Sequence, residues 1–173
     1  EALLKTGIGM SFMQNSRPAS GAEHIIAHLI ECIELQDNII PNLHGDDVGV
    51  CTLELLKYYN ELAELSSVTA QHERVDWDEI YEFYGPLQDE IKKMNHPDNI
   101  IDAVTPEKIE ELWSEIVKAI KGVPSYSECK AAMEKAGCKT TVEDIKKVTS
   151  HPQALSQCHD YIKMRGFETE EAN

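Results

Sequence analysis

Apolar residues recur at helical spacing along most of the chain, and the apolar–polar alternation typical of strands is absent from the sequence. The segments with helical spacing are 1–14, 21–36, 45–65, 76–84, 86–94, 105–121 and a last one that Ser125 opens and Gly137 closes. The pattern therefore predicts an all-α helical bundle. Segment 21–36 is apolar on nearly all sides, which predicts a buried central helix.

Two local signals refine these helices. Ser20 and Glu23 have the S-x-x-E spacing of a capping box, so a helix is predicted to begin near Gly21. In segment 1–14 we expect the apolar residues to face inward. Gly7 lowers the helix propensity there by about 1 kcal/mol relative to Ala, so we also expect it to lie in close contact with a neighbour.

Composition narrows the possible partners and compartments. The chain has 31 acidic and 16 basic residues, a formal charge of −15, and no Lys/Arg cluster interleaved with aromatics. Nucleic acids and anionic membranes are therefore not expected as partners. No apolar run approaches the roughly 18 residues of a membrane span. Five scattered cysteines without a C-x-x-C pair indicate a reduced, cytoplasmic protein.

Three histidines carry the candidate chemistry. His24 and His28 lie four residues apart, on one face of the predicted helix, and His44 follows 20 residues after His24. Imidazole is a common ligand of zinc, and a catalytic metal usually has three protein ligands and an open position. The spacing alone equally allows another interpretation, in which His24 and His28 belong to the core and His44 caps a helix.

The segments SRPASGAEH, H-x-x-x-H and HGDDVGV favour the metal site. Together they resemble the metal-binding half of the iron-containing alcohol dehydrogenase and dehydroquinate synthase superfamily, and within it the sn-glycerol-1-phosphate dehydrogenases. The resemblance implies that His24 and His44 are metal ligands and that His28 is a catalytic residue, which contacts the substrate and relays a proton, and not a ligand. It also suggests that Arg17 meets a phosphate group, because a guanidinium binds phosphate oxygens bidentately. The alternative is that Arg17 is an exposed cap of the preceding helix.

The same resemblance implies a fold, cofactors and an activity. The fold is the helical C-terminal domain of a dehydroquinate synthase-like two-domain protein. The cofactors are a divalent metal (zinc, or else nickel or iron) and NAD(P). The intact enzyme would interconvert dihydroxyacetone phosphate and sn-glycerol 1-phosphate, a reaction of phospholipid biosynthesis.

Two parts of that family's site are not found in this sequence. In the family, a third ligand, an Asp, and the nucleotide-binding domain both precede the first histidine. Here 23 residues precede His24, none of them Asp, and no G-x-G-x-x-G turn follows a strand-like run. We therefore expect this chain to be the C-terminal domain or a cleaved remnant of a longer enzyme, inactive alone, with the missing N-terminal domain as its partner. Assembly into a homo-oligomer is left open.

Two alternatives to this function are kept. One is a glycerol or alcohol dehydrogenase, or a dehydroquinate synthase-like enzyme, of the same superfamily, although SRPASG argues against it. The other is a non-catalytic helical interaction module.

The segment SHPQALSQC, residues 150–158, resembles a signature of prephenate dehydratases. Other motifs of those enzymes are absent from the sequence, so we expect no dehydratase activity. The segment is either a chance similarity or a chimeric terminus. We accordingly divide the chain into a helical metal-binding domain, 1–149, and a C-terminal helix and tail, 150–173.

Overall fold

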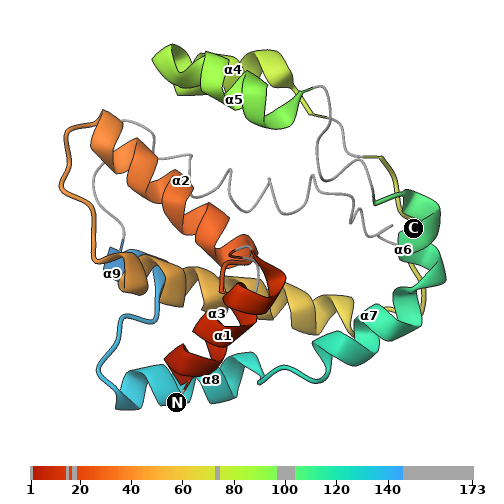
Figure 1. The fold of residues 1–173 in the computed structure, drawn as a ribbon. Coiled ribbons are helices and arrows are strands. Elements are labelled where there is room, and N and C mark those ends of the chain that lie inside the picture. The colour runs from red at the N-terminus through yellow and green to blue at the C-terminus, as the bar shows by residue number, and fades with distance from the viewer. Residues whose placement is uncertain (1, 15, 17–18, 73–74, 97–103, 146–173) are drawn as a thin grey trace, which may run out of the picture. The chain divides into compact units, whose positions relative to one another are not determined.

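The structure is a computed structural model that describes the chain except residues 1, 15, 17–18, 73–74, 97–103 and 146–173. All regular structure in the described part is helical, which confirms the all-α prediction (Figure 1). The helices are α1 Ala2–Met13, α2 Ala22–Gln36, α3 His44–Leu62, α4 Trp77–Tyr84, η1 Gly85–Leu87, α5 Gln88–Asn95, α6 Pro106–Glu111, α7 Trp113–Ile120, α8 Tyr126–Lys135 and α9 Val142–Ile145. Among the described residues, none of these helices is both long and apolar enough to cross a bilayer.

The described part of the chain forms two compact units, one of residues 2–64 and 120–145 and the other of residues 65–119, apart from the gaps given above. In the first unit, α2 packs along α3, and α3 also contacts α8 and α9 (Figure 1). The apolar core lies mainly between α2 and α3. Its buried side chains are Ile26, Ala27, Ile30, Ile33, Val50, Cys51, Leu53, Leu55, Leu56 and, from α9, Ile145.

Helix α2 buries one face only, so the prediction of a fully buried central helix is wrong. Ile25 and Leu35 are 54% and 61% exposed on the other face. The predicted capping box also differs, because the N-cap is Gly21 and not Ser20. The Glu23 carboxylate instead accepts the Gly21 N–H at 2.8 Å, which satisfies one of the free donors at the start of the helix.

Helix α3 begins at His44 itself, with Asp46 and Asp47 in its first turn, where the helix dipole favours negative charge. The segment before it is fixed to α9, since Asn42 donates from Nδ2 to the carbonyl of Ile145 at 2.9 Å. Lys139 adds an ion pair to Asp46 at 3.3 Å. These contacts hold the start of α3, and therefore His44, in place.

Helix α1 does not pack as predicted. Leu4, Ile8, Phe12 and Met13 are 56–84% exposed. A Cβ built on Gly7 would meet nothing within 4 Å, so close packing does not explain this glycine. The apolar residues of α1 surround the helix instead of forming one stripe, and a helix without a stripe has no single face to bury.

The second unit contains α4 to α6 and most of α7. Asp76 caps α4 as predicted, accepting the Glu79 N–H at 3.1 Å. The predicted helix 86–94 begins instead with the 3₁₀ turn η1. The predicted helix 105–121 is interrupted at Leu112. Just after the break, Trp113 is 5% exposed and donates from its indole N–H to the carbonyl of Leu65 at 3.1 Å.

Candidate metal centre

The three histidines singled out in the sequence lie together where α2 faces the start of α3. His24 and His28 come from consecutive turns of α2, and His44 is the first residue of α3. The ring centroids of His28 and His44 are 4.8 Å apart with the rings nearly parallel, at 18°. The His24 ring stands edge-on to both, 6.2 Å from His28 and 5.1 Å from His44.

None of these histidines belongs to the core. Their side chains are 25% exposed at His24, 61% at His28 and 44% at His44. This exposure argues against core histidines at positions 24 and 28. The N-cap of α3 is Leu43, so His44 is not the capping residue either.

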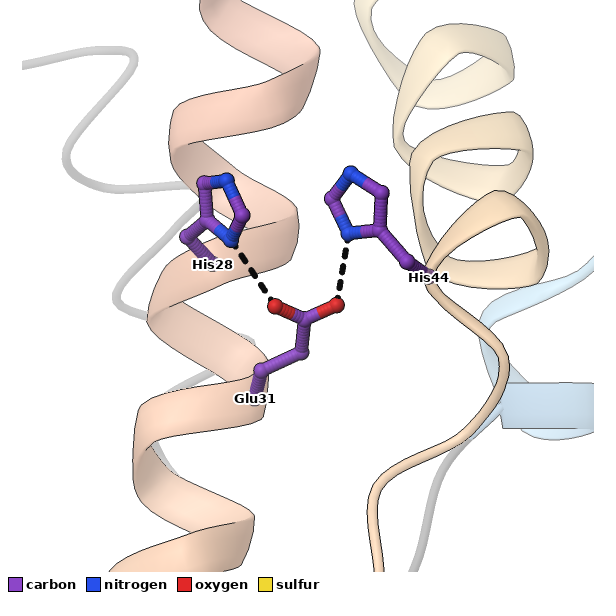
Figure 2. A group of neighbouring side chains, drawn as sticks. All are labelled: His28, Glu31 and His44. Atoms are coloured by element: carbon purple, nitrogen blue, oxygen red, sulfur yellow. Dashed lines mark hydrogen bonds and ion pairs between the residues drawn. The ribbon is translucent and has the colours of Figure 1, made fainter.

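A fourth residue of the cluster, Glu31, was not predicted from the sequence. Its Oε2 lies 2.8 Å from His28 Nδ1 and its Oε1 lies 2.6 Å from His44 Nδ1, so one carboxylate bridges two helices (Figure 2). The ligand atoms of His28, Glu31 and His44 all lie within 4.8 Å of one another. A signal was present in the sequence, because Glu31 follows His28 by three residues and so shares its helix face.

His24 has a carboxylate of its own. Its Nδ1 lies 3.2 Å from Glu23 Oε1, the oxygen that also accepts the Gly21 N–H. Each of the three imidazoles is thus paired with a glutamate through Nδ1. In the described part of the chain, these are the polar contacts of the three rings.

The charges at the cluster keep both glutamates ionised. Partial desolvation acts to raise the pKa of Glu31, but the hydrogen bonds and Coulombic interactions with His44 and His28 outweigh it and leave that pKa below its usual value. Partial burial likewise acts to raise the pKa of Glu23, while bonds from the Gly21 and Glu23 backbone and from His24 lower it on balance. The site therefore holds two ionised carboxylates, Glu23 and Glu31, beside the three imidazoles.

The donor set fits a divalent transition metal. His28, Glu31 and His44 bring two imidazoles and a carboxylate close together, the nitrogen and oxygen ligands that zinc binds, and the His24 ring lies beside them. Cys32 is adjacent to Glu31 in sequence, and burial raises the pKa of its thiol, with the charge of Glu31 adding to the effect. The ligand atoms that lie within reach of one another are those of His28, Glu31 and His44, and Cys32 is not among them.

Other sequence predictions lie outside the described residues. These are Arg17, the segment 150–158 and the domain boundary placed after residue 149. The role of Arg17 and the domain boundary stay predictions, whereas the resemblance of segment 150–158 is borne out by a family match given below.

Fold and site together define a helical domain with a candidate divalent-metal centre between two helices. The chain is homologous to glycerol-1-phosphate dehydrogenases [NAD(P)+], which confirms the resemblance seen in its motifs. It is 31% identical over 105 residues to the enzyme of Geobacillus thermodenitrificans, 58% of this chain and 26% of that one. It is 46% identical over 63 residues to the enzyme of Bacillus velezensis, 36% of this chain and 16% of that one. A third relative, from Geobacillus stearothermophilus, is 30% identical over 145 residues, 84% of this chain and 30% of its own.

The chain thus spans less than a third of the length of these curated relatives. A second similarity overlaps its C-terminal part, where the family model for prephenate dehydratase matches residues 116–173. In that range the structure describes the end of α7, α8 and α9. No solved structure gives a significant match to the chain.

Proposed function

We propose that this chain is the C-terminal, metal-binding domain of an NAD(P)-dependent sn-glycerol-1-phosphate dehydrogenase. The intact enzyme would interconvert dihydroxyacetone phosphate and sn-glycerol 1-phosphate in the cytoplasm. The observation that carries the proposal is the meeting of His24, His28 and His44 at the α2–α3 junction, in a chain homologous to enzymes of that name. Zinc, nickel and iron all suit this donor set.

The residues of this chain have separate roles in the proposal. His24 and His44 hold the metal through ring nitrogens on two different helices. His28, the most exposed of the three, is open to solvent and contacts the substrate. Arg17 binds the phosphate group. When bound, the metal supplies Lewis-acid stabilisation of the oxygen that becomes negative as the carbonyl is reduced.

The nucleotide and a further ligand are assigned to another domain of the intact enzyme. This assignment follows the family resemblance, since the sequence carries no dinucleotide-binding turn after a strand. The 173-residue chain should therefore bind zinc but not the dinucleotide, and should not reduce dihydroxyacetone phosphate by itself.

Calorimetric titration of the chain with zinc tests the metal site. Binding should be lost or weakened by about tenfold or more, roughly 1.4 kcal/mol, in His24→Ala and in His44→Ala. His72→Ala is the matched control, because His72 is an exposed histidine in the other unit. Loss of zinc binding in the control but not in His24→Ala would refute the ligand assignment.

Titration with NADH, followed by fluorescence, tests whether the nucleotide site lies in another domain of the intact enzyme. No saturable binding is expected up to about 1 mM, the weak-binding limit of roughly −4 kcal/mol. Saturable binding would show that the nucleotide site lies in this chain and would overturn the proposed domain assignment.

A further inference from the structure

Glu31 contacts two histidines that come from different helices. Its Oε2 meets His28 Nδ1 at 2.8 Å and its Oε1 meets His44 Nδ1 at 2.6 Å. An ionised carboxylate can only accept hydrogen bonds, so both ring Nδ1 atoms must be the donors. Both contacts have the short length of charge-assisted hydrogen bonds.

The two contacts also fix which ring nitrogen is left for a metal. A neutral imidazole that carries its proton on Nδ1 has its lone pair on Nε2. In Figure 2 both Nδ1 atoms face Glu31, and the second nitrogen of each ring lies on the side away from it. The rings are nearly parallel, at 18°, and in Figure 2 the second nitrogens of both lie on the same side.

We propose that Glu31 is a positioning residue that holds His28 and His44 as Nδ1–H tautomers, so that Nε2 of each ring keeps its lone pair and lies on the side away from Glu31. The inference rests on the proposed metal site. It assigns Glu31 to the outer shell and not to the ligand set, because an ion held by Nε2 of His44 lies across that ring from the Glu31 oxygens. A carboxylate on the far nitrogen of a ligating histidine sets the ring orientation and raises its basicity.

Long-range ¹H–¹⁵N spectra of the metal-free 173-residue chain test this directly, since they distinguish Nδ1–H from Nε2–H imidazoles. At pH about 9, where an ordinary imidazole is neutral, His28 and His44 should both be Nδ1–H. Glu31→Gln keeps the shape of the side chain but offers one acceptor oxygen, so at least one ring should change tautomer. Glu31→Ala should remove the preference for the Nδ1–H tautomer from both rings.

Glu23→Gln is the matched control. Glu23 is a neighbouring glutamate on the same helix that contacts His24, 3.2 Å away. Its substitution should alter His24 and leave His28 and His44 as Nδ1–H. Circular dichroism of each variant confirms that the helices are retained, and the partly exposed position of Glu31 favours folding of the variants.

Zinc affinity gives the second measurement. Glu31→Gln should weaken zinc binding by about 10- to 100-fold, the usual effect of losing an outer-shell partner, and the bound zinc should still perturb Nε2 of His44. If both rings are Nε2–H in the wild type, or both stay Nδ1–H in Glu31→Gln, the inference is wrong. If the tautomers follow Glu31 but zinc binding ignores His24 and His44, the tautomer assignment stands and the proposed metal function fails.

Discussion

Asn42 donates a hydrogen bond from Nδ2 to Oδ1 of Asp47 at 3.0 Å. Asp47 is fully buried, and its other oxygen, Oδ2, has no hydrogen-bond partner in the described part of the chain. The same Asn42 amide donates to the Ile145 carbonyl, and its Oδ1 accepts from Lys139 at 3.2 Å. One side chain thus satisfies one oxygen of a buried carboxylate and links α9 to the segment before α3.

Asn42→Ala should therefore destabilise the chain. It removes a partner from a buried carboxylate and from a backbone carbonyl, a loss of about 1–3 kcal/mol in the free energy of unfolding. Urea unfolding followed by circular dichroism measures it. Asn60→Ala, at an exposed position of α3, is the control and should change stability by less than about 0.5 kcal/mol. Equal effects of the two substitutions would show that the Asn42 contacts contribute nothing.

Asp47 also predicts a pH dependence of stability. Burial raises its pKa, Asn42 and Lys139 oppose that, and the charges of Glu34 and Glu31 add to it, leaving the pKa above its ordinary value. The folded chain then binds this proton more tightly than the unfolded chain. The Asp47 contribution to stability is greatest at low pH and declines as pH rises from the unfolded pKa through the folded pKa.

Comparison of the wild type with Asp47→Asn isolates that contribution, because the other carboxylates titrate in both proteins. The difference in unfolding free energy, wild type minus variant, should decrease between pH about 4 and pH about 7. An increase over the same interval would mean that the pKa of Asp47 is lowered by folding.

His28 and His44 should differ as metal ligands although their rings stack at 4.8 Å. In the proposed site His28→Ala retains zinc at a stoichiometry near one, whereas His44→Ala loses it, because only the latter removes a ligand. Metal analysis after dialysis distinguishes the two variants. Loss of zinc from His28→Ala would make His28 a ligand.

In an enzyme with the nucleotide domain, His28→Ala should also lower turnover by about 10²-fold, the usual scale for a positioned acid–base group.

Two glycines of the same unit should respond to alanine with opposite signs. Gly137 follows α8 with φ +75°, a conformation that disfavours a side chain by roughly 1–2 kcal/mol, so Gly137→Ala should destabilise the chain. Gly7 lies inside α1 with open space around it, and Gly7→Ala should stabilise that helix by about 0.5–1 kcal/mol. Thermal unfolding of both variants checks the signs. A stabilising Gly137→Ala would contradict the left-handed turn after α8.

The sequence predicted the helices with local signals best. Asp76 and Ser125 each cap a helix with a residue three positions on, and both caps are present. The sequence-based prediction failed for features that depend on tertiary packing. The apolar residues of α1 are exposed, and the helix predicted over 105–121 is interrupted at Leu112, next to the anchored Trp113. Neither the exposure of α1 nor the break at Leu112 can be derived from neighbouring residues in the sequence alone.

The candidate metal centre was likewise only partly predictable from the sequence. His24 and His28 were placed together correctly because a four-residue step is fixed by helix geometry. Glu31 escaped prediction because glutamate is common on helices, and its second partner, His44, lies 13 residues away across a turn. The pairing depends on how α2 and α3 pack, which spacing does not encode.

Because His28 and His44 share one carboxylate, the arrangement of the cluster should be sensitive to a single substitution at Glu31. Because Glu31 contacts both imidazoles, a substitution at this one position removes a contact from each of them. In a copy of this gene that is no longer under selection, one substitution at Glu31 would be enough to remove both of these contacts. Retention of Glu31 together with both histidines in diverging copies would therefore record continued selection on the site.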